Sequence, residues 1–391
     1  MTRRILLVVI LAILGTFVAC GGGGIGPGTA ATRTFAQASF HAGIAHVAGN
    51  YGFTQENYLL EGAKQIQKLG SKSIFVYLTP SYRTKYPDRG AGMWNGNPSS
   101  LQELAQTKAF KKLFAMPFDT FVLTANTFSN DGQITGISGD DARLQAEEDE
   151  FYGLAKYLYS AYAGSGKNFI LKNWEGDWIG LQDYDTSKDI SPSRIDDMIA
   201  WFSARERGVE RARNEVGSTD VSVLNAVEVN RVLDYAQHGM DRLINKVVPQ
   251  VRPDMVTYSS YDSSSKGKDA ASVQANVNIA LDTINKLAPD PLGLGSRRIL
   301  ISEYGMFENE QPNDAWRADA ILKTAKSAGL AGAVLWNVFD NECMQSNGQP
   351  AGVGLTPGAW GRPKNGQCRG LWAIRPDGST SSVVKVLKKF W

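Results

Sequence analysis

The sequence has few of the residues that build metal centres or disulfide frameworks. Its 391 residues include three cysteines and three histidines, and the histidines match no metal-ligand spacing. Lys and Arg number 41 and Asp and Glu number 39, so no excess of charge indicates a nucleic acid as partner. No G-x-G-x-x-G motif follows an expected strand, which argues against a dinucleotide-binding fold. We therefore expect an activity that needs no metal and no organic cofactor.

The one long apolar run lies at the N-terminus. Arg3 and Arg4 precede apolar residues 5–18, a stretch too short to span a bilayer comfortably. Ala19-Cys20 and four glycines follow, a pattern that resembles a bacterial lipoprotein signal with Cys20 as the lipidated residue. An ordinary secretory signal with an incidental cysteine is the alternative. We expect residues 1–19 to be a signal peptide, 20–34 a Gly-rich tether and 35–391 one catalytic domain, exported and lipid-anchored at the bacterial envelope.

The other two cysteines are expected to pair. An exported protein meets oxidising conditions, and Cys343 and Cys368 flank a segment rich in Gly, Pro and Asn that has little else to order it. We predict a Cys343–Cys368 disulfide.

Strand-like and helix-like segments alternate along the rest of the chain. Apolar runs predict strands at 39–47, 73–78, 120–125, 168–173, 221–227, 254–259, 298–302 and 331–336. Helical periodicity predicts helices at 55–69, 101–114, 140–162, 192–216, 235–251, 269–287, 315–327 and 381–390. Such alternation means parallel strands joined by crossover helices. Eight such units predict a single (β/α)8 barrel, and we expect a monomer.

Two glutamates stand where apolar strands run out. Glu175 follows Asn173-Trp174, and Glu303 follows Ile301-Ser302 and precedes Tyr304. Active sites of such barrels gather at the C-terminal ends of the strands, and glycoside hydrolysis needs a pair of carboxylates. The other candidate substrate-binding residues near strand ends are His41, Asn173, Trp174, Trp178, Glu228, Tyr258, Tyr261 and Trp336.

This arrangement resembles the clan A glycoside hydrolases, (β/α)8 enzymes with an acid/base Glu at strand four and a nucleophile Glu at strand seven. Residues 301–305 match the nucleophile strand well. Around Glu175 the match is partial, since Trp174 separates Asn173 from the glutamate, and the strand-two arginine of several member families is missing. The resemblance implies that Glu175 is the acid/base, Glu303 the nucleophile and Trp336 the floor of the sugar site. It also implies a β-linked oligo- or polysaccharide as substrate.

The roles require different environments for the two acids. Burial between Trp174 and Trp178 would raise the pKa of Glu175, and a hydrogen bond from Tyr258 or Tyr261 would keep Glu303 ionised. Asn173 is expected to bond the sugar 2-hydroxyl. Retention of configuration requires carboxyl groups about 5–5.5 Å apart.

Alternatives remain open at this point. Asp177 could replace Glu175 and pair with Glu303 in an inverting hydrolase, for which the separation would be roughly 6.5–9.5 Å. Glu228 is either a substrate contact or a salt-bridge partner, and His41 and His46 are either core residues or ligands. The alternative that is not an enzyme is a catalytically inactive lipoprotein that binds carbohydrate. For an enzyme or a binding protein alike, Trp94, Trp178 and Trp360 are candidate platforms on which a sugar could stack.

Overall fold

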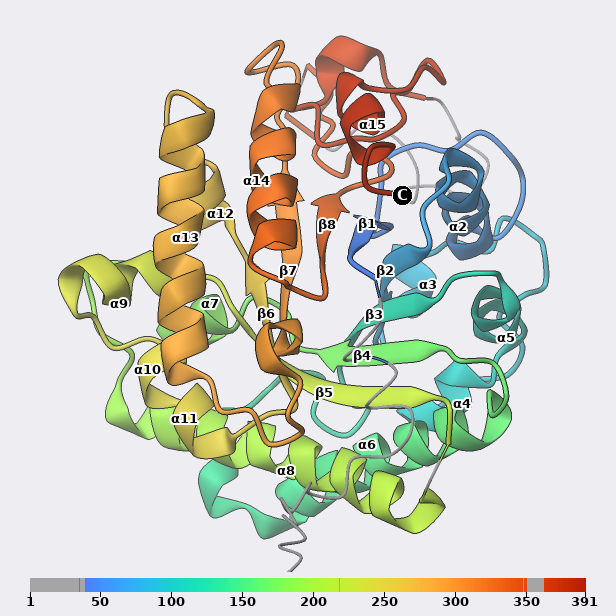
Figure 1. Ribbon diagram of the computed structural model, residues 1–391. Coiled ribbons are helices and arrows are strands. Elements are labelled where there is room, and N and C mark those ends of the chain that lie inside the picture. The colour runs from blue at the N-terminus through green and yellow to red at the C-terminus, as the bar shows by residue number, and fades with distance from the viewer. Residues whose placement is uncertain (1–34, 36–38, 218, 347, 350–361) are drawn as a thin grey trace, which may run out of the picture.

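The chain forms a closed barrel of eight parallel strands in sequential order, surrounded by helices (Figure 1). The computed structural model describes residues 35, 39–217, 219–346, 348–349 and 362–391. The predicted (β/α)8 fold is confirmed. The strands are β1 His41–Ala45, β2 Ser73–Leu78, β3 Thr120–Ala125, β4 Asn168–Lys172, β5 Ser222–Val229, β6 Met255–Ser259, β7 Ile299–Gly305 and β8 Gly332–Trp336.

Alternating residues of the strands fill the inside of the barrel. Phe75, Val122, Ile170 and Leu224 are neighbours in register on β2 to β5 and belong to one buried cluster. The residues between them, such as Phe121, pack outward against the helices. Two positions further along, β2, β3 and β4 carry polar groups on Tyr77, Thr124 and Lys172, whereas β5 carries Ala226. The pleat therefore places a lysine inside the barrel, near the C-terminal ends of the strands.

The helices cover the outside of the barrel, and α6 and α8 lie side by side along one flank (Figure 1). They are α2 Tyr58–Leu69, α3 Tyr82–Lys85, α4 Leu101–Ala105, α5 Lys108–Ala115, α6 Asp141–Ala161, α7 Gly176–Leu181, α8 Pro192–Val216, α9 Val232–His238, α10 Leu243–Lys246, α11 Val248–Val251, α12 Tyr261–Ser264, α13 Ala270–Leu287, α14 Ala315–Ser327 and α15 Ser382–Leu387.

The single helix predicted at 235–251 is wrong. Three short helices, α9, α10 and α11, occupy this stretch. Gly239 ends α9 in a left-handed conformation, and buried Arg242 then donates to the carbonyl groups of Thr186 and Lys188. A glycine at such a place is a recognised helix-stop signal, and the apolar periodicity on either side masked it.

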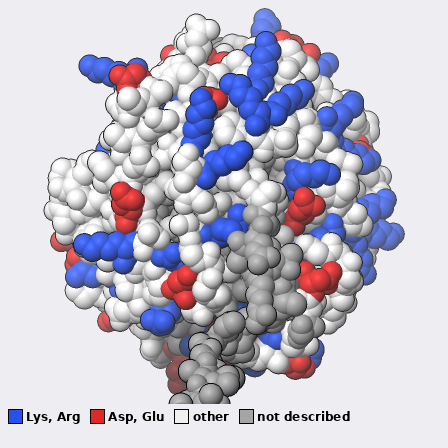
Figure 2. Space-filling model, viewed as in Figure 1, with Lys and Arg blue, Asp and Glu red and all other residues white. Residues whose placement is uncertain are grey.

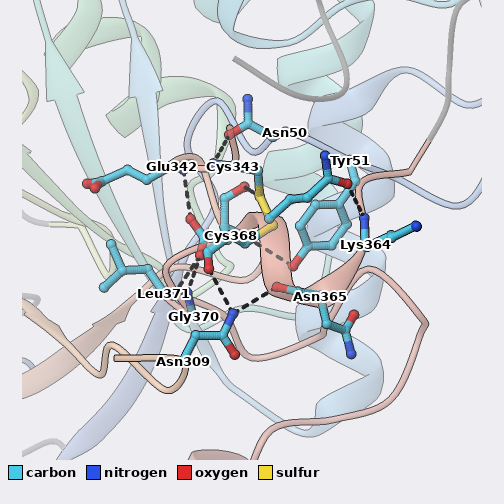
Figure 3. The surroundings of a disulfide bond; sticks show 12 residues. Asn50, Tyr51, Asn309, Glu342, Cys343, Lys364, Asn365, Cys368, Gly370 and Leu371 are labelled. Atoms are coloured by element: carbon cyan, nitrogen blue, oxygen red, sulfur yellow. Dashed lines mark hydrogen bonds between the residues drawn. A yellow bond between two sulfur atoms is a disulfide. The ribbon is translucent and has the colours of Figure 1, made fainter. Parts of the chain in front are cut away.

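The loop after β8 is closed by the predicted disulfide between Cys343 and Cys368 (Figure 3). Next to it, the Asp340 carboxylate accepts hydrogen bonds from the backbone N–H groups of Glu342, Gly370 and Leu371. Two distant stretches of the chain, around 340 and around 370, are thereby held together.

We expect loss of this disulfide to destabilise the loop. A covalent link across 25 positions restricts the unfolded chain, so a Cys343→Ser/Cys368→Ser variant should lose about 3 kcal/mol of unfolding free energy. Urea denaturation of the variant and the parent protein measures the difference. An unchanged denaturation midpoint would show that Asp340 and its three donors suffice to order the loop.

The outer surface carries charges of both signs. Figure 2 shows Lys and Arg side chains on one face with Asp and Glu among them. Among the described residues no helix combines the length and the apolar character that crossing a membrane requires. Cys20 and the expected tether lie outside the described residues.

Candidate active site

A cavity of about 680 Å³ opens at the C-terminal ends of the strands. Every strand except β5 contributes to its wall, through its last residues or the loop that follows. The lining residues are Val47, Ala48, Tyr77, Thr79, Ser81, Lys85, Thr124, Asn126, Trp174, Glu175, Trp178, Tyr261, Glu303, Phe307, Trp336, Asn341, Glu342 and Leu371. Glu175 and Glu303, from β4 and β7, thus face one shared space.

Glu303 reaches the cavity because β7 is irregular. The pairing of β7 with β8 shifts register between Ile301 and Tyr304, and a second shift occurs between Tyr258 and Ser259 on β6. In a regular strand, consecutive residues point to opposite faces. Here Ser302 hydrogen-bonds to Glu228 inside the barrel while its neighbour Glu303 lines the cavity. A bulge that redirects one side chain explains how both face inward.

Glu175 lies just beyond β4, at the start of α7. Its carboxylate accepts a hydrogen bond of 2.7 Å from the Ser259 hydroxyl, and its backbone N–H donates to Glu228. The next residue is necessarily a glycine, because a Cβ at Gly176 would lie 2.5 Å from the Glu228 carbonyl oxygen. Burial raises the pKa of Glu175 to about 7; the Ser259 hydrogen bond opposes this and the Glu228 charge adds to it. The group can therefore hold a proton near neutral pH.

Lys172 is the cation beneath the two acids. It is fully buried, and its Nζ lies 2.5 Å from Oε1 of Glu228 and 3.6 Å from Oε1 of Glu303. Glu228 also accepts from the Ser302 hydroxyl. Glu228 thus holds Lys172 in place, whereas the Oε1 atom of Glu303 has no hydrogen-bond partner within the described residues.

Opposing effects act on Glu303. Burial and the nearby Glu228 and Glu175 carboxylates raise its pKa well above the ordinary value, while Lys172 lowers it. Because the two cavity acids repel each other when both are charged, a state with one proton between them is favoured.

Four predicted aromatic residues line the cavity: Trp174, Trp178, Tyr261 and Trp336. The indole N–H of Trp336 donates to Asn341, which fixes the ring at the cavity wall. A Cβ at Gly305 would lie 2.8 Å from the Tyr261 hydroxyl, so that glycine makes room for the tyrosine. Flat apolar rings beside hydroxyl-rich walls suit a sugar.

Two predicted substrate ligands are instead structural. Asn173 is fully buried, and its amide bonds the backbone of Trp174 and of Glu228 on both sides. Glu228 is also fully buried and forms the ion pair with Lys172. Neither residue is among those that line the cavity, and Glu228 has the salt-bridge partner that the sequence left open as an alternative.

Tyr258 and Asp177 are likewise engaged elsewhere. The Tyr258 hydroxyl donates to the Asp262 carboxylate and also lies within hydrogen-bond distance of the Ser263 hydroxyl, so its one proton is not directed at Glu303. Asp177 is fully buried and accepts from the backbone N–H groups of residues 230, 231 and 243. Its carboxylate joins three segments and is not among the groups that line the cavity.

The histidines lie away from the cavity. His41 is the first residue of β1, at the opposite end of the barrel from Glu175, so the structure does not bring this predicted ligand to the cavity. In the predicted strand, 39–47, His41 likewise stands near the N-terminal end. His46 is buried and bonds the Tyr58 carbonyl oxygen. Trp94 is buried, and its indole N–H donates a hydrogen bond to the carbonyl oxygen of Tyr86. Trp360 lies outside the described residues.

Sequence reasoning missed the polar wall that follows β2 and β3. Thr79, Ser81, Lys85, Thr124 and Asn126 line the cavity there. Thr124 is two positions beyond Val122, so strand alternation could have placed it inside the barrel. The others lie beyond the strand ends, in loops or, for Lys85, in the short helix α3, and the sequence does not reveal the course of these segments.

One cluster in the described part of the chain has metal-ligand types in reach of one another: Asp340, Cys343 and Cys368. Its two sulfur atoms form the disulfide and its carboxylate holds backbone N–H groups, so these atoms are already committed.

Comparison with known proteins identifies the fold. No sequence-family model matches the chain, and neither does any curated protein. Solved structures do match. The catalytic domain of a glycoside hydrolase family 26 endo-β-1,4-mannanase from Bacillus sp. JAMB-750 is 14% identical with a TM-score of 0.52, over 92% of this chain and 87% of that one. The fold is shared.

Two further structures agree. A glycoside hydrolase family 5 lichenase from a Caldicellulosiruptor species, in complex with cellotetraose, is 10% identical with a TM-score of 0.51, over 93% of this chain and 96% of that one. The catalytic domain of CelCCA is 9% identical with a TM-score of 0.51, over 93% and 94%. At such identities the likeness concerns the barrel and its element order alone.

Proposed function

We propose that this protein is a retaining glycoside hydrolase that cleaves a β-linked oligo- or polysaccharide, with Glu175 as acid/base and Glu303 as nucleophile. The observation that carries the proposal is that both carboxyl groups line one cavity, Glu175 with a pKa of about 7 and Glu303 beside a buried lysine. The barrel that the chain shares with glycoside hydrolases of families 5 and 26 supports it as an analogy of fold.

In the first step the Glu303 carboxylate attacks the anomeric carbon. Glu175 gives its proton to the glycosidic oxygen as the bond to the leaving sugar breaks, and a glycosyl ester forms on Glu303. Lys172 stabilises the charged form of Glu303 before the attack.

In the second step Glu175, now a carboxylate, takes a proton from water. The water oxygen attacks the same anomeric carbon, the ester bond breaks, and Glu303 leaves as a carboxylate. Two inversions give net retention, for which we expect a carboxyl separation of about 5–5.5 Å.

Hydrolysis assays test the proposal directly. The purified protein from residue 35 onward is incubated with β-glucans, xylans, mannans and bacterial exopolysaccharides, and the anomeric form of the first product is followed by NMR. We expect release of reducing sugar with the β-configuration retained. Binding to glycans without any hydrolysis would instead identify a carbohydrate-binding protein.

Lys172 gives a more specific prediction. Lys172→Met removes the cation that favours ionised Glu303, so the acid limb of the pH–rate profile should move upward by about 1–3 pH units. Because this change also leaves Glu228 without its partner, Lys172→Met/Glu228→Gln is the matched variant that keeps the barrel interior neutral. An unshifted acid limb in both variants would show that Lys172 has no influence on Glu303.

We also propose that the protein is exported and anchored through a lipid on Cys20. The support is the order of segments in the N-terminal sequence, in which two basic residues are followed by an apolar stretch and then by Ala19-Cys20. Metabolic labelling with a fatty acid should mark the parent protein and not a Cys20→Ser variant. Equal absence of label in both would favour an ordinary secretory signal.

A further inference from the structure

Lys85 is a cation in the wall of the cavity. It ends the short helix α3, which follows β2, and its side chain is partly buried. Its Nζ lies 5.6 Å from the centre of the Tyr77 ring, and Tyr77 lines the same cavity. The charges of Glu175, Glu228 and Glu303 all act on the Tyr77 hydroxyl. Tyr77 therefore lies between Lys85 and the part of the cavity that holds the two acids.

No carboxylate pairs with Lys85. Every Asp and Glu of the chain belongs to the described residues, and none lies within 4.0 Å of its Nζ. Burial lowers the pKa of Lys85, and no neighbouring acid acts to raise it. Two other lysines whose side chains are wholly or partly buried differ from Lys85 because each has hydrogen-bond acceptors for its ammonium group. Lys172 pairs with Glu228, and Lys167 donates to the carbonyl groups of Met116 and Phe118.

The charges around the cavity are segregated. The wall beside Lys85 is neutral and hydroxyl- or amide-bearing: Thr79, Ser81, Thr124 and Asn126. Acids come from other walls, namely Glu175, Glu303 and Glu342, and the Glu342 carboxylate is held by Arg369 at 2.6 Å. An anion entering the cavity is thus attracted to the β2 side and repelled by the side that carries the acids.

A partly desolvated ammonium group without a counter-ion costs free energy in the empty site. A ligand anion recovers that cost and forms a charge-assisted hydrogen bond, whereas a neutral sugar hydroxyl supplies only the hydrogen bond. The structure therefore favours a ligand with a negative group at this wall.

We propose that Lys85 binds the anionic group of an acidic sugar, so that the substrate is a β-linked glycan containing negatively charged units such as uronic acids. This inference rests on the proposed glycosidase function for its place in a reaction, but the binding site itself does not require turnover. A sulfate ester offers the same chemistry as a uronate carboxylate, and the experiment separates the two.

The test measures binding in a Glu303→Gln variant, which keeps the ligand intact. Isothermal titration calorimetry compares oligosaccharides of glucuronoxylan, polymannuronate and unsulfated chondroitin with their carboxyl-reduced counterparts. A sulfated cello-oligosaccharide is compared with its unsulfated parent. We expect at least one acidic ligand to bind about tenfold or more tightly than its neutral counterpart. Lys85→Met should abolish the difference, and Lys85→Arg should retain most of it.

Each outcome decides the proposal. Dependence on Lys85 for a uronate, or for the sulfate ester alone, supports it and identifies the anion. Equal binding of all acidic and neutral pairs, or a preference that survives Lys85→Met, overturns it. Thermal unfolding of Lys85→Met checks the fold, and no loss of stability is expected because no ion pair is removed. Binding through Lys85 without hydrolysis by the parent protein would refute the glycosidase and leave this site standing.

Discussion

Replacing Glu303 with alanine should reduce glycan hydrolysis by on the order of 10⁴-fold or more, because the covalent intermediate then has no carboxylate on which to form. Added azide should restore turnover by entering the vacated space, and its product should be a glycosyl azide of inverted configuration. Glu210→Gln, on the exposed face of α8, is the matched control and should retain full activity. Hydrolysis by Glu303→Ala at the parent rate would exclude Glu303 as nucleophile.

The same residue has a predicted effect on stability. In the unfolded chain Glu303 ionises at its ordinary pKa, whereas burial and its acidic neighbours hold the folded-state pKa above that value. The group therefore subtracts from stability at every pH above its unfolded pKa, and the cost disappears with neutral glutamine. We expect the melting temperature of Glu303→Gln at pH 7 to equal or exceed that of the parent, as active-site acids often trade stability for function.

The second large effect is expected at Glu175. Glu175→Gln removes the proton donor, so hydrolysis of a substrate with a sugar leaving group should fall about 10²–10⁴-fold. A dinitrophenyl glycoside needs no protonation to depart, and its first step should proceed nearly as in the parent protein. The glycosyl-enzyme should then accumulate, giving a burst of dinitrophenol followed by slow turnover. Equal losses on both substrates would point to a structural role for Glu175.

The pH profile checks the same assignment. Because the pKa of Glu175 is about 7, the kcat/KM of the parent enzyme should decline as pH rises through that value and the acid loses its proton. In Glu175→Gln, which has no proton to lose there, the alkaline limb should be absent. An alkaline limb that persists in the variant would assign the titration to another group.

Much of the barrel could be predicted because its strands are short apolar runs with clear ends. The ranges predicted for β2 and β3 coincide with the observed ones, and the other six differ only at their ends. The failure at 235–251 has a local cause. Gly239 and Pro249 interrupt an apolar periodicity that continues on both sides, and tertiary contacts of Arg242 fix the break.

The candidate site was predictable only in part. Element order and strand ends pointed to Glu175 and Glu303, and aromatic residues at or just after strand ends pointed to Trp174, Trp178, Tyr261 and Trp336. Errors arose where the direction of a side chain decides whether a residue reaches the cavity. Asn173 and Glu228 stand at strand ends near the site, but the side-chain amide of Asn173 hydrogen-bonds to the backbone of Glu228 and so links the end of β4 to β5. Lys172 carried a usable signal, since a lysine two positions after Ile170 falls on the inward face of its strand.

The bulge in β7 carried no such signal. Strict alternation along Ile301, Ser302 and Glu303 would turn either Ser302 or Glu303 away from the barrel interior. The register shift against β8 brings both inward, and nothing in the residue types announces it. Lys85 was missed for a related reason, because the path of the loop after Thr79 depends on packing rather than on periodicity.

The central claim is that Glu303 forms a covalent bond to the sugar while Glu175 serves it from the same cavity. Mass spectrometry of the protein after incubation with a 2-deoxy-2-fluoroglycosyl fluoride of the preferred sugar tests this claim most directly, because the fluorine slows release of the intermediate. We expect one added glycosyl group, carried by the peptide that contains Glu303. A label on any other residue, or unlabelled protein that hydrolyses its substrate with inversion, would contradict it.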